Sequence, residues 1–299
     1  MSELRYRNLC VFIDGTGNSD FKTPAEDQTN VSRLWHACSH DSKNESTQRL
    51  YYKPGVGTRD NEGIWGMAAG RYLEDRVSES QSWLDNEVRL CEEDGFVPRI
   101  YIFGFSRGAY AARWLANKLN LKVEFLGVWD TVKTTLKGPD VSEASVKIKR
   151  IFHAIAIDEH RKLFDVTRFH NSPQAVEVWF PGCHADVGGG YKEYELATLS
   201  LNWIARHACR AGLMVDFSKL PVESRLNKMP IMHDEAKKIG WKIANFFKGN
   251  CYCNREIAMT DVMHPCVDVI KSFDYSPAYL PANYIVWNDN TVGSKANFA

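Results

Sequence analysis

The sequence contains five short apolar segments, each followed directly by a loop with glycine or aspartate, and this pattern constrains the fold most. The segments are Asn8–Ile13, Leu50–Lys53, Arg99–Phe103, Val123–Trp129 and Ala175–Phe180. Continuous apolar strands that alternate with helices are typical of a parallel sheet covered on both faces. We therefore expect the α/β class with a mainly parallel central sheet and helices on both faces. The loops after such strands meet at one edge of the sheet, where ligands bind.

Segments with helical periodicity lie between these strands and predict the covering helices. We expect helices over residues 30–38, 107–119, 142–162 and 194–211, one or two helices over residues 64–92, and a short helix within residues 260–270. No repeat, linker or low-complexity block interrupts the 299 residues. We therefore expect a single domain over residues 1–299.

The composition excludes several classes of protein. Apolar residues make up 44% and charged residues 25% of the chain, which is ordinary for a globular protein. Lys plus Arg and Asp plus Glu both number 37, so no net field attracts a polyanion and we expect no nucleic-acid partner. The apolar stretches are far shorter than the roughly 18 residues of a membrane span.

The polar start of the chain, Met1–Asn8, lacks the apolar segment of a signal peptide. We therefore expect a protein that is cytoplasmic as synthesised. Secretion by a machinery that needs no cleavable signal stays open as the alternative.

The eight cysteines are scattered along the chain, and several lie inside apolar runs, where a thiol packs as a small apolar group. Cys251 and Cys253 are close, but their spacing is not that of a zinc site. We expect reduced thiols, no metal and no cofactor.

The most informative motif is Gly104-Phe105-Ser106-Arg107-Gly108, between a predicted strand and a predicted helix. A sharp turn there lifts its central side chain above the sheet, and small flanking residues are needed because the backbone is crowded. This is the nucleophile elbow, which predicts an α/β-hydrolase-like fold with Ser106 as the nucleophile. The helix amino terminus would offer the amide of Arg107 to a developing oxyanion.

A serine nucleophile needs a histidine base, which in turn needs an orienting carboxylate. Asp130 and Asp186 both follow strands, and the candidate bases are His264, near the carboxyl end, and His184. The chain order Ser, Asp, His leads us to predict Ser106, Asp186 and His264, each from a different loop. The alternative is Asp130 with His264 or with His184. The aspartate left over is expected to hold a loop through backbone amides.

A glycine-rich loop, Asp14-Gly15-Thr16-Gly17-Asn18, follows the first strand, where such hydrolases place their second oxyanion amide. We predict the amide of Gly15 or Thr16 as this donor and expect Asp14 to tie the loop down. The absence of a following Gly-Lys-Ser/Thr excludes a P-loop, and the glycine spacing does not match the dinucleotide fingerprint.

Six segments together resemble one family, the α/β-hydrolase domain of bacterial type VI secretion phospholipase effectors and of related uncharacterised proteins in bacteria and fungi. They are Phe12–Asn18 (FIDGTGN), Pro54–Thr58 (PGVGT), Gly104–Ala109 (GFSRGA), Gly127–Val132 (GVWDTV), Trp179–Gly182 (WFPG) and His184–Tyr191 (HADVGGGY). The resemblance extends over residues 8–283. It implies a serine esterase that acts on glycerophospholipid acyl chains with a Ser-Asp-His triad and no metal. Carried onto this sequence, it makes Ser106 the nucleophile.

These observations predict a serine hydrolase of carboxylic esters, with a phospholipid or another lipid ester as substrate. The resemblance also implies peripheral membrane contact and an immunity or secretion partner protein. Two alternatives stay open, namely a non-lipid esterase or thioesterase and a catalytically idle hydrolase fold that binds a partner.

Overall fold

The fold is built on one parallel sheet. The computed structural model describes residues 4–15, 27–38, 47–55, 70–133, 138–223, 226–237, 252–277 and 279–289. These residues form an eight-stranded sheet in the order β2-β1-β3-β4-β5-β6-β7-β8, in which all neighbours are parallel. The predicted α/β class with a mainly parallel sheet is confirmed.

The strands are β1 (Arg5–Ile13), β2 (Gln48–Lys53), β3 (Phe96–Phe105), β4 (Val123–Trp129), β5 (Ile151–Ala156), β6 (Ala175–Phe180), β7 (Val262–Met263) and β8 (Ile285–Val286). The α-helices of the described residues are α1 (Asn30–Cys38), α3 (Gly70–Glu93), α4 (Arg107–Lys118), α5 (His184–Gly188), α6 (Glu195–Arg210) and α8 (Cys266–Lys271). The helices predicted over residues 30–38, 107–119 and 194–211 are therefore α1, α4 and α6.

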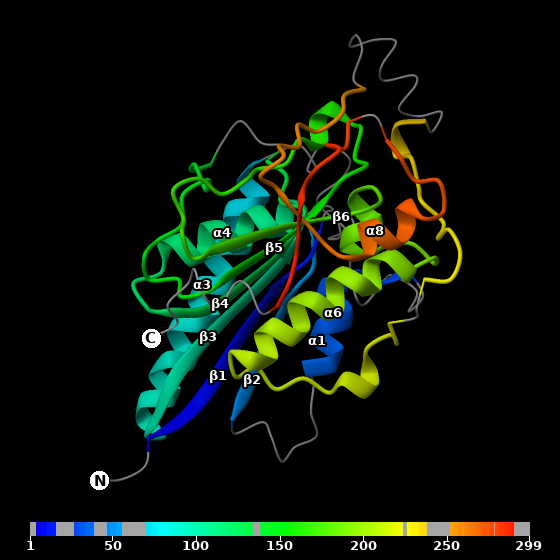
Figure 1. Cartoon of the computed structure of the whole chain (residues 1–299). Coiled ribbons are helices and arrows are strands. Elements are labelled where there is room, and N and C mark those ends of the chain that lie inside the picture. Colours follow the sequence, from blue (N-terminus) through cyan, green and yellow to red (C-terminus); the bar gives the residue numbers. More distant parts are fainter. Residues whose placement is uncertain are drawn as a thin grey trace.

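Alternate side chains of β1 point to opposite faces of the sheet and enter separate cores. Cys10 and Phe12 pack in one core with residues of α1 and α6, whereas Leu9, Val11 and Ile13 pack in the other with residues of α3 and α4. Figure 1 shows α3 and α4 on one side of the sheet and α1 and α6 on the other. Because both faces are covered, the central strands are apolar at successive positions.

The predicted helix over residues 142–162 is wrong, because Ile151–Ala156 forms β5 between β4 and β6. All six residues of β5 are buried. A short continuous apolar run has no period that separates a buried strand from a buried helix. The correction matters for the site, because the Ala154 carbonyl of β5 accepts the amide of Asp130, at 2.8 Å.

The turn between β3 and α4 is possible only because glycines flank it. Ser106 has φ 60° and ψ −126°, a conformation that side chains rarely adopt. A Cβ on Gly104 would lie 2.5 Å from the carbonyl oxygen of Gly108, and one on Gly108 would lie 2.3 Å from that of Ile13. These obstacles are backbone atoms, which cannot swing aside as a side chain can. The crowding that the motif predicts is present, and it holds Ser106 at the carboxyl end of β3.

Gly108→Ala should destabilise the protein by roughly 3 kcal/mol or more, because the added methyl overlaps the backbone of β1 and overpacking is costly. Helix propensity alone would make the alanine variant more stable by about 1 kcal/mol. The overlap with β1 is therefore expected to reverse the sign of the change in stability. Urea unfolding followed by circular dichroism measures the change. Lys118→Gly, at the exposed end of the same helix, is the control and should cost no more than about 1 kcal/mol. A Gly108→Ala variant as stable as the wild type would contradict the geometry.

Candidate active site

Loops that follow β3, β4 and β6 carry Ser106, Asp130 and His184, and the structure brings these loops together. The amide of Ser106 donates to the carbonyl of Trp129 at 3.0 Å, so the serine turn is bound to the loop of Asp130. The ring of His184, the first residue of α5, lies 4.6 Å from the ring of Phe105, centroid to centroid. The Ser106 turn is therefore bound to the loop of Asp130, and the neighbouring Phe105 lies next to the ring of His184.

His184 and Asp130 form a buried pair. Nδ1 of His184 lies 2.5 Å from Oδ2 of Asp130, and the two side chains are 7% and 0% exposed. A carboxylate only accepts hydrogen bonds, so Nδ1 carries the proton and Nε2 of a neutral His184 is left as the proton acceptor. This is the tautomer that a general base requires. The hydroxyl of Ser106 makes no capping hydrogen bond to α4.

A buried arginine binds the same carboxylate. Nη1 of Arg255 lies 2.5 Å from Oδ1 of Asp130, and Nη2 lies 3.0 Å from Oδ2. The amide of Ala156 donates to Oδ1 as well, at 2.9 Å. Burial alone would raise the pKa of Asp130, but the charge of Arg255 and the hydrogen bond from His184 hold it well below its usual range. Asp130 is therefore ionised at neutral pH.

A second histidine supports the loop of Asp130 from β5. Nε2 of the fully buried His153 accepts the amide of Thr131 at 3.1 Å, and its Nδ1 lies 2.9 Å from Oε1 of Glu177. Burial lowers the pKa of His153, so the ring is neutral and Nδ1 donates to Glu177. Arg168 binds the other oxygen of Glu177 at 3.0 Å. This network holds the backbone next to Asp130, whose φ is 42°.

Asp186 ties two loops together. Its Oδ2 accepts the amides of Cys183 and His233, at 3.0 and 2.9 Å, and its Oδ1 lies 2.7 Å from Nδ1 of His233. The ring of His233 also stacks on Tyr191, with centroids 3.9 Å apart. Asp186 thus makes the backbone contacts that were expected of the aspartate outside the reacting pair.

The structure does not bring His264 to Ser106 or Asp186, and this corrects the predicted trio. His264 follows β7, which lies four strands from β3, a separation of about 19 Å at the usual strand spacing. Its ring stacks on Phe180 with centroids 4.6 Å apart, and its Nδ1 accepts the amide of Cys266 at 3.3 Å. His184 reaches Asp130 instead, because α5 begins soon after β6 and turns back over the end of the sheet.

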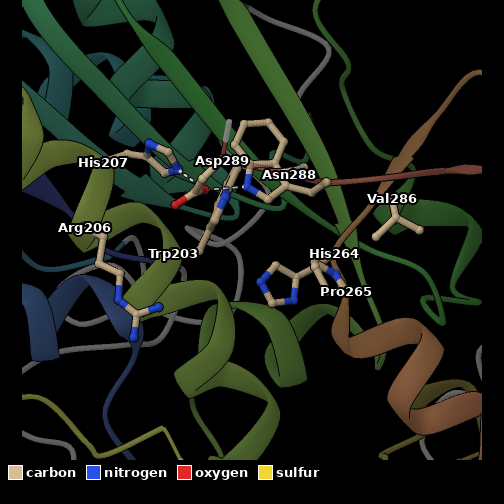
Figure 2. Close-up of a pocket in the computed structure, with 9 residues that line it drawn as sticks. Trp203, Arg206, His207, His264, Pro265, Val286, Asn288 and Asp289 are labelled. Carbon is tan, nitrogen blue, oxygen red and sulfur yellow. Dashed lines mark hydrogen bonds and ion pairs between the residues drawn. The ribbon is translucent and has the colours of Figure 1, made fainter. Parts of the chain in front are cut away.

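Figure 2 shows the actual surroundings of His264, a cavity of about 410 Å³ between α6, the start of α8 and the segment that follows β8. Trp203, His207 and Asp289 line the same cavity. Burial lowers the pKa of both His207 and His264 to about 4, so both rings are neutral at pH 7. The cavity is lined by none of the residues of the Asp130–His184 pair.

The Asp14 loop is held as expected, but the amide of Gly15, one of the two predicted oxyanion donors, already makes a hydrogen bond within the loop. The carboxylate of Asp14 accepts the hydroxyl of Thr29 at 2.9 Å and that of Tyr52 at 2.6 Å. The amide of Gly15 donates to the same carboxylate at 2.6 Å, so it is not available to an oxyanion in this structure. Thr16 lies outside the described residues.

Arg107 is the first residue of α4, directly after Ser106. The first amides of a helix point out of its amino end, where negative charge is favoured. The predicted use of the Arg107 amide is therefore compatible with the position of the helix. Burial also lowers the pKa of the Arg107 side chain to about 10, which leaves it charged at neutral pH.

Within the described ranges, no three His, Cys, Asp or Glu side chains gather into a set that could hold a metal ion. None of the described helices is both long and apolar enough to cross a membrane. The cysteines of the described part of the chain have free thiols, whereas Cys251 lies outside it.

A match to one protein-family model shows which family the chain belongs to. The model of the T6SS phospholipase effector Tle1-like catalytic domain matches residues 7–121 and 117–207, more than half of the chain. The chain belongs to this Tle1-like family. The resemblance seen in the sequence motifs is thereby confirmed. The matched region contains Ser106, Asp130 and His184 but ends before Arg255.

Solved structures and a curated protein are similar to this Tle1-like chain over part of their length. An uncharacterized protein from Pseudomonas aeruginosa shares 22% identity (TM-score 0.49, 71% of this chain and 47% of that one). The Tle1 effector bound to the VgrG spike of the type 6 secretion system shares 20% (TM-score 0.48, 63% and 52%). The uncharacterized protein YEL023C of Saccharomyces cerevisiae is 40% identical over 52 residues, 16% of this chain and 8% of that protein. The chain spans about half the length of the two structures.

Arg255 and His153 were not among the site residues predicted from the sequence. His153 lay within a predicted helix, so its place beside the Asp130 loop was hidden. Arg255 stands in a segment without a motif, 125 positions from Asp130. No local signal in the sequence indicates that contact.

Glu177→Gln should destabilise the protein at neutral pH by up to about 3 kcal/mol, and the difference should shrink in acid. Burial would raise the pKa of Glu177, but the hydrogen bond from His153 and the charge of Arg168 lower it to about 2. A depressed carboxyl pKa contributes stability above the unfolded-state value, about 4.3, and the contribution is lost as pH falls toward 2.

Urea unfolding of wild type and variant at pH 7, 4 and 3 tests this. The exposed Glu92→Gln, the control, should change stability by no more than about 0.5 kcal/mol at any of these pH values. A difference for Glu177→Gln that stays constant down to pH 3 would argue against the ionised network.

Proposed function

We propose that this protein is a serine hydrolase that cleaves carboxylic esters of lipids, with Ser106 as nucleophile, His184 as base and Asp130 as orienting acid. The observation that carries the proposal is the buried Asp130–His184 pair, whose Asp130 loop is bound to the turn that holds Ser106 in the strained elbow conformation. Membership of a phospholipase effector family supports a lipid ester as the substrate. By the same membership, the proposal includes a secretion-related protein partner.

In this mechanism the hydroxyl oxygen of Ser106 attacks the ester carbonyl carbon while Nε2 of His184 takes the hydroxyl proton. The oxyanion forms at the amino end of α4, where the Arg107 amide and the helix dipole favour negative charge. The tetrahedral intermediate then expels the alcohol, which takes the proton from His184. The acyl group stays on Ser106 as an ester.

Water completes the cycle. It attacks the acyl carbon and gives a proton to Nε2 of His184, and the second tetrahedral intermediate expels the Ser106 oxygen, which recovers that proton. The carboxylic acid leaves. Asp130 keeps the Nδ1 proton in place throughout and stabilises the imidazolium, a role for which its low pKa suits it because it stays ionised.

The other His–Asp pair, His233 with Asp186, supports this role less well. Oδ2 of Asp186 already holds two backbone amides. Among the described residues, no hydrogen bond joins this pair to the Ser106 turn, whereas the loop of Asp130 is bound to that turn directly.

Ser106→Ala, His184→Ala and Asp130→Asn should each lower kcat/KM for a p-nitrophenyl ester by roughly 10⁴-fold, by analogy with serine proteases. His264→Ala is the matched histidine control and should stay within about threefold of the wild type, because His264 lies about 19 Å along the sheet from β3. Circular dichroism establishes that each variant is folded. Equal losses in His264→Ala and His184→Ala, or a large loss in folded Asp186→Asn with a normal Asp130→Asn, would show that the assignment is wrong.

The substrate class is tested with phospholipid vesicles and mass spectrometry of the lipid products. Wild-type protein should release free fatty acid and lysophospholipid, and Ser106→Ala should release neither. A panel of p-nitrophenyl esters of increasing acyl length runs in parallel. Preference for short, water-soluble acyl groups with no lipid product would favour a non-lipid esterase.

A further inference from the structure

We propose that Arg255 is a positioning residue of this site: it fixes the orientation of Asp130, and its charge opposes the cation that forms on His184 during the reaction. The inference rests on the proposed function of Ser106, His184 and Asp130. It adds a residue from outside the region that the family model matches, residues 7–207.

The guanidinium of Arg255 is held rigidly. It binds both oxygens of Asp130, and its side chain is 2% exposed. Its Nη1 also donates to the carbonyl of Ala156 at 2.7 Å, and its Nη2 donates to that of Phe164 at 2.6 Å. A planar fork with four such contacts fixes a carboxylate in one plane. Asp130 therefore presents Oδ2 to His184 in one orientation.

Arg255 and His184 share one carboxylate oxygen. Oδ2 of Asp130 contacts Nδ1 of His184 and Nη2 of Arg255 at once. When His184 takes the proton of Ser106, two cations face one anion in a buried place. A nearby like charge disfavours the protonated form of a base. Arg255 thus offsets part of the attraction that Asp130 exerts on the imidazolium formed during the reaction.

None of the other charged groups that the structure describes near the pair opposes the imidazolium of His184 in this way. Glu159 accepts the amide of His184 at 3.3 Å, but its carboxylate is bound by the guanidinium of Arg161 through two hydrogen bonds of 2.8 and 2.7 Å. His153, which faces Asp130 from β5, is neutral because burial lowers its pKa. Other charged or titratable groups around Asp130, His184 and Arg255 include Glu159, Arg161, Asp165, Arg113, His153 and Glu177. Of the described cations, Arg255 is the one hydrogen-bonded to Asp130.

The test measures the rate at which a fluorophosphonate probe labels Ser106 of the 299-residue chain between pH 5 and 9. This measurement needs no knowledge of the substrate. Arg255→Gln should lower the rate at least tenfold and move the midpoint of its acid limb up by roughly one pH unit, because the opposing charge is gone. Arg255→Lys should also lower the rate, because one ammonium cannot hold both oxygens, but its midpoint should stay within about 0.3 unit of the wild type. Arg210→Gln, at an exposed arginine paired with Asp289, is the control and should change neither.

A folded Arg255→Gln with the wild-type midpoint, or an equal shift in Arg255→Lys, overturns the inference. If Arg255→Gln fails to fold, Arg255→Lys decides: a lower rate with an unchanged midpoint supports positioning, and the wild-type rate overturns it. Wild-type protein that is not labelled at Ser106 overturns the proposed function and this inference together. Labelling that Ser106→Ala abolishes and that the Arg255 variants leave unchanged overturns this inference alone.

Discussion

The carboxylate of Asp130 has no exposure to solvent, and the arrangement of the site depends on how its charge is balanced. An unpaired buried charge costs several kcal/mol, so it must find a cation and hydrogen bonds within the protein. Arg255, His184 and the Ala156 amide supply them. These groups come from three parts of the chain, so the pair can form only when those parts are placed together. The need to balance this buried charge therefore brings the residues of the site together.

The serine is presented by a different kind of constraint, the close approach of backbone to backbone. Gly104 lies against the carbonyl of Gly108, and Gly108 lies against the end of β1. No side chain larger than hydrogen fits at either position. The strain of φ 60° at Ser106 is maintained because β1, β3 and α4 are packed around the turn. This constraint is local in the sequence, which is why the motif Gly-Phe-Ser-Arg-Gly predicts it.

The two histidines that follow neighbouring strands illustrate how the sheet separates residues with similar sequence contexts. His184 starts a helix that turns back toward β4, and its ring reaches Asp130. His264 stays at the end of β7, where its ring lies on Phe180 and its Nδ1 accepts a backbone amide. Both follow apolar segments, and the chain order alone admits either as the base. Only the direction of the chain after each strand distinguishes them.

The sequence by itself determined the α/β class, the serine turn, the loop function of Asp14 and a short set of candidate acids and bases. These properties follow from local patterns, since apolar runs, glycines and their spacing act on nearby residues. The tertiary structure decided that β5 is a strand, that Asp130 rather than Asp186 lies with His184, and that Arg255 binds the same carboxylate. Those outcomes depend on contacts between residues 24 to 125 positions apart. The cost of leaving the buried charge of Asp130 unpaired favours the arrangement in which His184 and Arg255 meet it, and no local sequence pattern records such distant contacts.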